Sequence, residues 1–514
     1  MILITSAAYC SPALVAEFGK LPPCMLPVQN RRLYEHQLAL MPPDMYVVLT
    51  LPQSYKLSEY DSKKLETQRV EVLYIDENLS LGASIYEALK RVGIADEPLY
   101  ILHGDALFSK LDFQVDVYAV SKPEDDYAWA KSSDSGKVYA GWFTIADAKD
   151  FVSALRISEM SFVTAHEWYA KRHDVHDVEL PDWLDFGLVN SYYRSCSRLT
   201  TQRAFNDLKI SRYAVRKFSS DKKKMRAEAE WFKALPYDMR HYAPAVWDCG
   251  ENEEKGYYEI EYFYNSTLAN LWVFGENPFV IWKEILGACA EYFDDEYKHK
   301  PLDIQKVARV NDNLFVAKTQ QRLATYCMDN GVEMDEAWKI NGHETPSLNA
   351  IMGELDNVIS KHDVRFASLM HGDTCFSNIL YDFKSKSIKV IDPRGLSADG
   401  QLSVWGDVRY DVAKLAHSVL GMYDYIIGGR YSYRQYASHD LNLSFDTHPT
   451  IGEIQSYFQQ MQFAGYTIAE LQVYPIMILL FLSMLPLHAD RPDRQKAFLA
   501  NALRLYVEYK QSTR

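Results

Sequence analysis

The fold of this chain is decided by one stretch, residues 369–393, which read LMHGDTCFSNILYDFKSKSIKVIDP. In this stretch Asp373 lies five residues before Asn378, and the strand-like run IKVI leads directly into Asp392. Phosphoryl transfer needs one carboxylate that orients or deprotonates the attacking hydroxyl, and oxygen ligands that hold Mg²⁺ on the nucleotide phosphates. Asp373 is the candidate for the first role, and Asn378 and Asp392 are the candidates for the second.

The spacing matches the H-x-D-x-x-x-x-N loop of protein kinases, except that Pro393 stands where those enzymes have the Phe of D-F-G. The segments LMHGD, NIL and VIDP instead resemble the aminoglycoside phosphotransferase and choline kinase family, whose members phosphorylate small-molecule alcohols. The resemblance covers the chain from about residue 200 onward. It implies an α+β bilobal, protein-kinase-like fold, ATP and Mg²⁺ as cofactors, and an alcohol or sugar as the substrate.

Length, charge and cysteine content limit the alternatives. A chain of 514 residues is too long for one ordinary core, so two or three domains are expected. The formal net charge of −14 argues against nucleic acid as the partner, because phosphate backbones favour basic surfaces. The seven cysteines show no metal-ligand spacing, which favours reduced thiols in a cytoplasmic protein.

Neither secretion nor membrane insertion is expected. The sequence begins with the strand-like run ILIT and lacks the basic region typical of a signal peptide. The most apolar segment, 473–487, contains Pro475 and Pro486 and is short for a bilayer span, so it predicts a buried helix.

Residues 1–200 alternate strand-like and helix-like runs, which predicts an α/β domain with a mostly parallel, Rossmann-like sheet. Ligands of such sheets lie beyond the carboxyl ends of the strands, where the sequence His103-Gly104-Asp105 follows a strand candidate. The strand candidates are Ile2–Ser6, Tyr46–Thr50, Val70–Ile75 and Leu99–Leu102, and residues 84–91 form a helical pattern between them.

Residues 201–270 are expected to form the small lobe and hinge of the kinase-like domain, and residues 271–514 its large lobe. Lys217, in a strand candidate at 213–218, is the candidate contact to the α- and β-phosphates of the nucleotide. The backbone around Glu261 and Tyr262, at the end of another strand candidate, would meet the adenine edge at a hinge.

A charged helix expected from about 222 to 235 offers two partners for this lysine, Glu228 and Glu230. Glu228 is preferred, because the pattern E-x-x-W-F followed by L-P resembles capsule-associated members of the phosphotransferase family. In the segment GDVRYDVAKL at 406–415, Asp411 resembles an aspartate that supports the catalytic loop, and His371 is expected to brace that loop by hydrogen bonds.

The first domain resembles the sugar-phosphate and phosphocholine nucleotidyltransferases. The resemblance rests on CMLPV at 24–28, LYEHQL at 33–38, the Gly104-Asp105 pair and WLDFG at 183–187. In that family two aspartates hold Mg²⁺, and here those positions fall on Asp105 and Asp185.

Two departures from the nucleotidyltransferase pattern leave two alternatives open. The glycine-rich basic loop that approaches a triphosphate is replaced by SAAYCSP at 6–12, and Cys24 stands at the position of a phosphate-binding lysine. Either a divergent active enzyme recruits Lys20, Arg31 or Arg32, or the domain has kept the fold and lost the reaction.

These observations favour an ATP- and Mg²⁺-dependent kinase for a sugar, polyol or amino-alcohol, fused to a nucleotidyltransferase-like domain. The resemblance implies a role in precursors of bacterial capsule or other surface polysaccharides. The alternatives are a bifunctional enzyme with two active sites, and a pseudoenzyme that binds a nucleotide or sugar nucleotide. The oligomeric state is not predicted.

Overall fold

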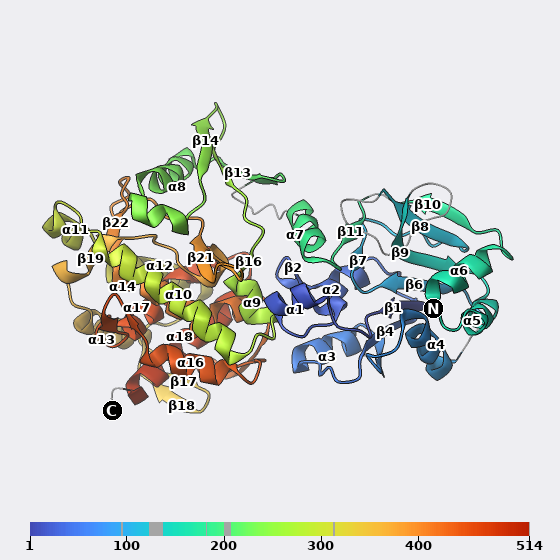
Figure 1. Cartoon of the computed structure of the whole chain (residues 1–514). Helices are drawn as coiled ribbons and strands as arrows, with labels where there is room; N and C mark the ends of the chain where they lie inside the picture. The colour runs from blue at the N-terminus through green and yellow to red at the C-terminus, as the bar shows by residue number, and fades with distance from the viewer. Residues whose placement is uncertain (94–95, 123–136, 181, 200–206, 312–313, 513–514) are drawn as a thin grey trace. The chain divides into compact units, whose positions relative to one another are not determined.

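The computed structural model describes residues 1–93, 96–122, 137–180, 182–199, 207–311 and 314–512 (Figure 1). The chain divides into two compact units, each described by itself. The first unit comprises Met1–Leu199 with Phe274–Asn277, and the second comprises Thr200–Val273 and Pro278–Arg514.

The first unit is built on a seven-stranded sheet with the strand order β10-β8-β9-β6-β1-β4-β5. Neighbouring strands are parallel except at β9, which runs antiparallel to both β6 and β8. The strands span Ile2–Thr5 (β1), Val47–Pro52 (β4), Val70–Ile75 (β5), Leu99–His103 (β6), Val117–Ser121 (β8), Val138–Ile145 (β9) and His176–Glu179 (β10). The four expected strands are therefore present within a residue or two of their predicted bounds.

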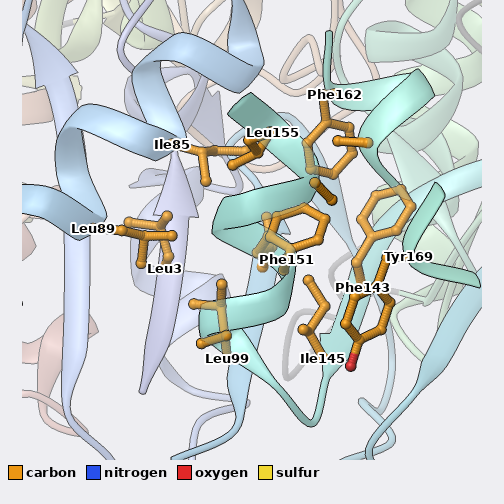
Figure 2. Packing of buried hydrophobic residues seen from close by; sticks show 14 of the residues in the cluster. Leu3, Ile85, Leu89, Leu99, Phe143, Ile145, Phe151, Leu155, Phe162 and Tyr169 are labelled. Atoms are coloured by element: carbon orange, nitrogen blue, oxygen red, sulfur yellow. The ribbon is translucent and has the colours of Figure 1, made fainter. Parts of the chain in front are cut away.

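Helices pack on this sheet through apolar faces (Figure 2). The helices of the unit are α1 (Pro12–Phe18), α2 (Leu33–Leu38), α3 (Glu59–Thr67), α4 (Leu81–Val92), α5 (Ala148–Ile157), α6 (Phe162–Ala170) and α7 (Val189–Arg198). Ile85 and Leu89 lie one turn apart on α4 and are fully buried with Phe143 of β9 and Phe151 of α5. Burial of each such side chain contributes roughly 1.5–3 kcal/mol.

Two short strands outside the main sheet bring together distant parts of the first unit. β7 (Ala106–Leu107) pairs antiparallel with β11 (Leu184–Asp185), with Asp185 opposite Ala106. The backbone N–H of Phe186 donates to the carbonyl of Asp105 at 2.8 Å. The loop after β6 and the segment around residue 185 are therefore held side by side.

The second unit begins with a four-stranded antiparallel sheet of order β12-β13-β15-β14, against which α8 packs (Figure 1). Its elements are β12 (Asp207–Ile210), β13 (Ala214–Ser219), α8 (Lys222–Ala234), β14 (Val246–Glu251) and β15 (Gly256–Glu261). The Asp221 side chain caps α8 by accepting a hydrogen bond from the N–H of Lys224. The strand and helix expected at 213–218 and 222–235 are both present.

The rest of the second unit is mainly helical. Its helices are α9 (Leu268–Phe274), α10 (Phe279–Lys298), α11 (Ile304–Asn311), α12 (Val316–Asn330), α13 (Leu348–Val358), α14 (Val408–Val419), α15 (Tyr423–Ile427), α16 (Ile451–Gln460), α17 (Val473–Met484) and α18 (Pro492–Ser512). α17 is buried along its whole length, as expected for the apolar segment from residue 473. Among the described helices, none combines the length and apolarity needed to cross a membrane.

Part of the stretch 369–393 forms a β-hairpin. β20 (Ile379–Asp382) and β21 (Ser387–Val390) pair antiparallel, with Ile379 opposite Val390, and β16 (Ser266–Thr267) pairs with the outer edge of β20. Asn378 therefore precedes the first strand at the same end at which Asp392 follows the second. Two further strands, β19 (Ala367–Leu369) and β22 (Trp405–Asp407), pair at the entry to this region.

Candidate active site

The structure brings Asp373, Asn378 and Asp392 together at the open end of the β20–β21 hairpin. The Asn378 side-chain amide donates to the carbonyl oxygen of Asp373 at 2.9 Å and to its carboxylate Oδ2 at 3.0 Å. The N–H of Ile391 donates to the carbonyl of Asn378 at 2.9 Å, which ties Asp392 to the same loop. The Asn378 amide oxygen, which accepts a hydrogen bond from the Ser377 hydroxyl at 3.3 Å, is the atom of this side chain that could bind a metal ion.

Asp392 joins this loop to the small antiparallel sheet. The Lys217 ammonium of β13 lies 3.0 Å from Asp392 Oδ1 and 2.7 Å from Glu228 Oε2 of α8. Asp392 adopts a φ of +57°, in the left-handed region that non-glycine residues rarely occupy. Such a conformation persists where the surroundings hold the residue in place.

The lysine and glutamate of this pair are both buried. Burial disfavours a charged lysine, but the Asp392 and Glu228 carboxylates outweigh it and raise the pKa of Lys217. Burial also raises the pKa of Glu228, against the influence of Lys217. The predicted Lys217–Glu228 ion pair is present, whereas Glu230 lies two residues further round the helix and pairs with Lys233 at 3.3 Å.

Tyr258 of β15 completes this cluster. Its hydroxyl donates to Glu228 Oε2 at 2.8 Å and lies 3.4 Å from Asp392 Oδ1. Sequence reasoning did not identify Tyr258. The sequence did contain a signal for Tyr258, because the alternation of side chains in a strand predicts that every second residue of β15 faces α8.

Two buried carboxylates hold the backbone of the loop at residues 371–373. Asp411 of α14 accepts hydrogen bonds from the N–H groups of His371 at 2.7 Å and Gly372 at 2.8 Å. Glu296 of α10 also accepts from the N–H of His371, at 3.0 Å. Burial raises the pKa of Asp411 to about 7 and that of Glu296 well above its usual range. This geometry agrees with the expected supporting role of Asp411, whereas no motif pointed to Glu296.

His371 and Gly372 have structural tasks in the same loop. Burial lowers the pKa of His371 to about 4, so its ring is neutral near pH 7, and its Nδ1 accepts from the N–H of Asp373 at 3.2 Å. Gly372 adopts a φ of +85°, and a Cβ there would lie 2.6 Å from the Cβ of Arg394. Trp231 of α8 donates to the carbonyl of Met370 at 2.8 Å, which connects the helix to the loop.

The Asp373 carboxylate faces a lysine that the motif did not reveal. Lys414 Nζ lies 3.0 Å from Asp373 Oδ1. Burial opposes ionisation of Asp373, but Lys414 outweighs it and lowers the pKa of the carboxyl. Lys414 lies three residues after Asp411 on α14, a spacing that places both side chains on one helix face. That spacing was the available signal.

The predicted hinge residues lie at the end of β15. The N–H of Glu261 donates to the carbonyl of Ala245 at 3.0 Å, and the N–H of Tyr262 donates to the carbonyl of Tyr213 at 2.9 Å. Both N–H groups therefore serve the sheet. A contact between this segment and adenine stays a prediction.

In the first unit, Asp105 and Asp185 face a common point. A Cβ at Gly187 would lie 2.7 Å from Asp105 Oδ2 and 3.3 Å from Asp185 Oδ1, so the absence of a side chain keeps this point open. Burial and the charge of Asp105 raise the pKa of Asp185 to about 6, and burial raises the pKa of Asp105. Asp185 Oδ2 is buried and has no hydrogen-bond partner among the residues that the structure describes. An orphaned carboxylate oxygen beside a second carboxylate fits a divalent cation.

The structure shows the surroundings of Cys24 and of the three cations that could replace the missing lysine. Cys24 is fully buried, and burial raises the pKa of its thiol to about 12, so it is neutral. Arg32 is buried, with Nη1 donating to the carbonyl of Met25 at 2.7 Å and Nε 3.6 Å from Asp61. Lys20 lies over the Tyr9 ring at 4.2 Å, and Arg31 is exposed. Of these three cations, Arg32 is engaged in contacts within the fold.

Among the described residues there is no group of three or more His, Cys, Asp or Glu side chains arranged around one metal position. Both aspartate sites offer at most two protein carboxylates to one metal position. About one or two carboxylates are typical of Mg²⁺ sites in which phosphates and waters supply the remaining ligands.

No family model and no curated protein matches the sequence. Among solved structures, the chain is similar to a thermostable mutant of the aminoglycoside phosphotransferase APH(4)-Ia in complex with AMP-PNP and hygromycin B, with 14% identity, 60% of this chain and 91% of that chain covered, and a TM-score of 0.37. It is similar to a putative fructosamine-3-kinase from Haemophilus somnus at 11% identity, over 57% of this chain and 83% of the other, with a TM-score of 0.33. Because these TM-scores are low, the function must be argued from the side chains themselves.

Proposed function

We propose that the second unit is an ATP- and Mg²⁺-dependent kinase that phosphorylates a hydroxyl group of a small molecule. The observation that carries this proposal is the convergence of Asp373, Asn378 and Asp392 in one loop region, beside the buried Lys217–Glu228 pair. In this proposal residues 201–270 act as the small lobe and hinge and residues 271–514 as the large lobe.

Each side chain has a role that its contacts support. Asp392 and the amide oxygen of Asn378 are the oxygen donors that would hold Mg²⁺, and the bound ion would supply charge neutralisation on the nucleotide phosphates. Lys217 is fixed by Glu228 so that its ammonium can contact the phosphates. This arrangement leaves Asp392 within reach of both the lysine and the loop.

Asp373 would orient the acceptor hydroxyl and accept its proton. Lys414 keeps the pKa of Asp373 low, so the carboxylate is ionised at neutral pH and can accept a hydrogen bond from the hydroxyl. Asn378 holds the other carboxylate oxygen. The two contacts restrict the direction in which the carboxylate can point, which is the positioning that phosphoryl transfer requires.

The test is ATP consumption by the full chain with a panel of sugars, polyols, choline and ethanolamine, followed by a coupled ADP readout. We expect Asp373→Asn to lower kcat by about 10²–10⁴-fold while circular dichroism and the melting temperature stay near those of the parent. Asp382→Asn, at the far end of β20 in the same hairpin, is the matched control and should retain activity. Undiminished turnover by a folded Asp373→Asn variant would reject the assignment.

For the first unit we propose a nucleotidyltransferase-like site at Asp105 and Asp185. The two converging carboxylates support it, whereas the neutral Cys24 favours a domain that has lost the reaction over an active one. Incubation of the full chain with each NTP and candidate sugar or alcohol phosphates, with pyrophosphate release as the readout, separates these alternatives. Pyrophosphate that disappears in Asp185→Asn would establish a bifunctional enzyme.

The cellular setting belongs to the same proposal. A kinase produces the phosphorylated acceptor that a nucleotidyltransferase consumes, so the two units fit consecutive steps toward a nucleotide-activated building block. A role in surface polysaccharide precursors rests on the sequence resemblance. The seven free cysteines support a reducing, cytoplasmic location.

A further inference from the structure

Four cationic side chains come from elements that lie near the Asp373 loop. Besides Lys414, these are Arg394, which follows Asp392 by two residues, and Lys318 and Arg322 of α12. They come from three separate elements, so no single charged helix face accounts for the cluster.

Arg394 is fixed directly beside the catalytic loop. Its N–H donates to the carbonyl of His371 at 2.8 Å, and its Cβ is 2.6 Å from where a Cβ at Gly372 would lie. Its guanidinium carbon lies 6.0 Å from the centre of the Tyr410 ring on α14. The side chain therefore extends from the catalytic loop toward the helix that carries Lys414.

Helix α12 is held against α17 on the same side of the unit. Arg322 Nη1 donates to the carbonyl of Ser483 at 3.3 Å, and the Thr319 hydroxyl lies 3.4 Å from the carbonyl of Leu479. Lys318 is one residue from Thr319. Burial, together with the charges of Arg394, Arg322 and Lys414, lowers the pKa of Lys318 to about 7, while Asp373 opposes that shift. The geometry agrees, because Phe315 at the N-cap of α12 has its ring centre 6.3 Å from that of Tyr410, the ring over which Arg394 lies, so the first turn of α12, which carries Lys318, begins beside Arg394.

The cluster lacks negative charge to balance it. Among the described residues neither Lys318 nor Arg394 has an ion-pair partner, and the buried Nη1 of Arg394 makes no hydrogen bond. Arg322 donates to a backbone carbonyl, and Lys414 is paired with Asp373. Lys318 and Arg394 are half-buried, and partly desolvated cations without partners are unfavourable, so an arrangement of this kind favours an anion from outside the chain.

We propose that the phosphate acceptor carries an anionic group, a carboxylate or a phosphate, that is bound by Lys318 and Arg394 while its hydroxyl faces Asp373. This inference rests on the proposed kinase function and narrows its substrate class. An acceptor with one hydroxyl and one anionic group satisfies both sides of the site. A neutral polyol would leave the cations unpaired, and a cationic amino-alcohol would be repelled.

The reaction is balanced as an ordinary phosphoryl transfer. The acceptor oxygen forms a bond to the γ-phosphorus, the bond between that phosphorus and the β,γ-bridging oxygen breaks, and ADP leaves. The hydroxyl proton passes to the Asp373 carboxylate. The anionic group takes no part in bond changes and serves to orient the acceptor.

The first experiment compares matched acceptors with the full chain and Mg²⁺–ATP: glycerol, glycerate, glycerol 3-phosphate and choline, and glucose, gluconate and glucose 6-phosphate. We expect ADP release with anionic members of these sets and at least tenfold lower kcat/KM with neutral and cationic members. The carboxylate and phosphate arms identify which anion the site binds. Equal or better turnover of glycerol, glucose or choline would overturn the inference and leave the kinase function standing.

The second experiment does not depend on finding the acceptor. With the protein saturated by Mg²⁺–AMP-PNP, calorimetry measures the binding of inorganic phosphate and of malonate. We expect Lys318→Gln and Arg394→Gln to weaken binding of the preferred anion at least tenfold without changing the affinity for AMP-PNP. The control Lys496→Gln, an exposed lysine of α18, should behave as the parent.

Three outcomes distinguish the two proposals. Anion binding that is absent in the parent, or unaffected by both variants, rejects the anionic acceptor. A loss of AMP-PNP affinity in Lys318→Gln or Arg394→Gln, equal to the loss of anion affinity, would assign the cations to the nucleotide and also reject it. A failure of the parent to bind Mg²⁺–AMP-PNP would reject the kinase function itself.

Discussion

The two units each place aspartates at a candidate site, but they balance the charge differently. In the second unit, Asp392 lies 3.0 Å from Lys217 and Asp373 lies 3.0 Å from Lys414. In the first unit, burial and a second carboxylate dominate, and they raise the pKa of Asp185 to about 6. The site in the second unit is ionised and ordered before any ligand binds, whereas the site in the first unit gains most from a bound cation.

Removing Lys217 should make the second unit resemble the first. Lys217→Met leaves Glu228 buried without its cation, so we expect a loss of about 3–5 kcal/mol in the free energy of unfolding and no measurable kinase activity. Denaturant unfolding and the ADP assay measure the two effects. The double variant Lys217→Met/Glu228→Met should recover much of the stability and none of the activity. A single variant as stable as the parent would show that the pair is not compensating buried charge.

Changing Asp411 tests how the ionised site is held in place. Asp411→Asn turns one of the two carboxylate oxygens into an NH₂ group, which faces a backbone N–H as a second donor, and Glu296 remains as an acceptor for His371 only. An unsatisfied buried donor costs about 1–3 kcal/mol. We expect that loss of stability with a lower kcat, since the loop positions Asp373, and little change in the KM for ATP. A KM effect without a kcat effect would contradict this role.

The uncompensated carboxylates of the first unit should make its stability depend on pH. The folded-state pKa of Asp185, about 6, lies above the usual value of 3.8, so the folded protein binds the proton more tightly. Stability from this group is therefore present at acid pH and is lost as pH rises from about 4 to about 6. Thermal unfolding should show this loss in the parent and not in Asp185→Asn.

Adding Mg²⁺ to the first unit should supply the positive charge that the second unit has from its lysines. At pH 7 we expect Mg²⁺ to raise the melting temperature of the first unit in the parent and to have no such effect in Asp185→Asn, because a ligand that binds the folded state stabilises it. Asp105→Asn removes the like charge and should lower the pKa of Asp185 toward its ordinary value. A Mg²⁺ response that survives in Asp185→Asn would place the ion elsewhere.

The smallest expected effect concerns Tyr258. Tyr258→Phe removes one hydrogen bond to Glu228 but leaves the lysine pair, so we expect a loss of about 0.5–1.5 kcal/mol and activity within a few-fold of the parent. Chemical denaturation and the ADP assay measure both. A loss as large as that of Lys217→Met would mean that the hydroxyl, through Asp392, shares the lysine's role.

Local sequence patterns predicted the parts of the site that lie close together in the chain. Asp373, Asn378 and Asp392 belong to one loop and one hairpin, so their spacing indicated that they meet. Lys217 and its helix partner follow on one strand and the next helix, and the family resemblance favoured Glu228 over Glu230. The expected strands of the first unit likewise followed from apolar runs of suitable length.

The parts that spacing could not predict come from distant helices. Glu296 reaches His371 from α10, and Lys318 belongs to α12, but neither lies in a motif. Their roles depend on how helices pack, which a single sequence does not specify. The meeting of Asp105 with Asp185 requires β7 to pair with β11, and it was expected from the resemblance to nucleotidyltransferases and not from spacing. A catalytic pattern is therefore easier to find than the residues that hold it or choose its substrate.

The clamp formed by Asp411 and Glu296 grasps amide groups of the main chain, not side chains of the loop. Substitutions on α12, where Lys318 and Arg322 lie, leave that clamp untouched. For the proposed kinase, a laboratory library confined to α12 should therefore alter the choice of acceptor while the loop that carries Asp373 keeps its main-chain support.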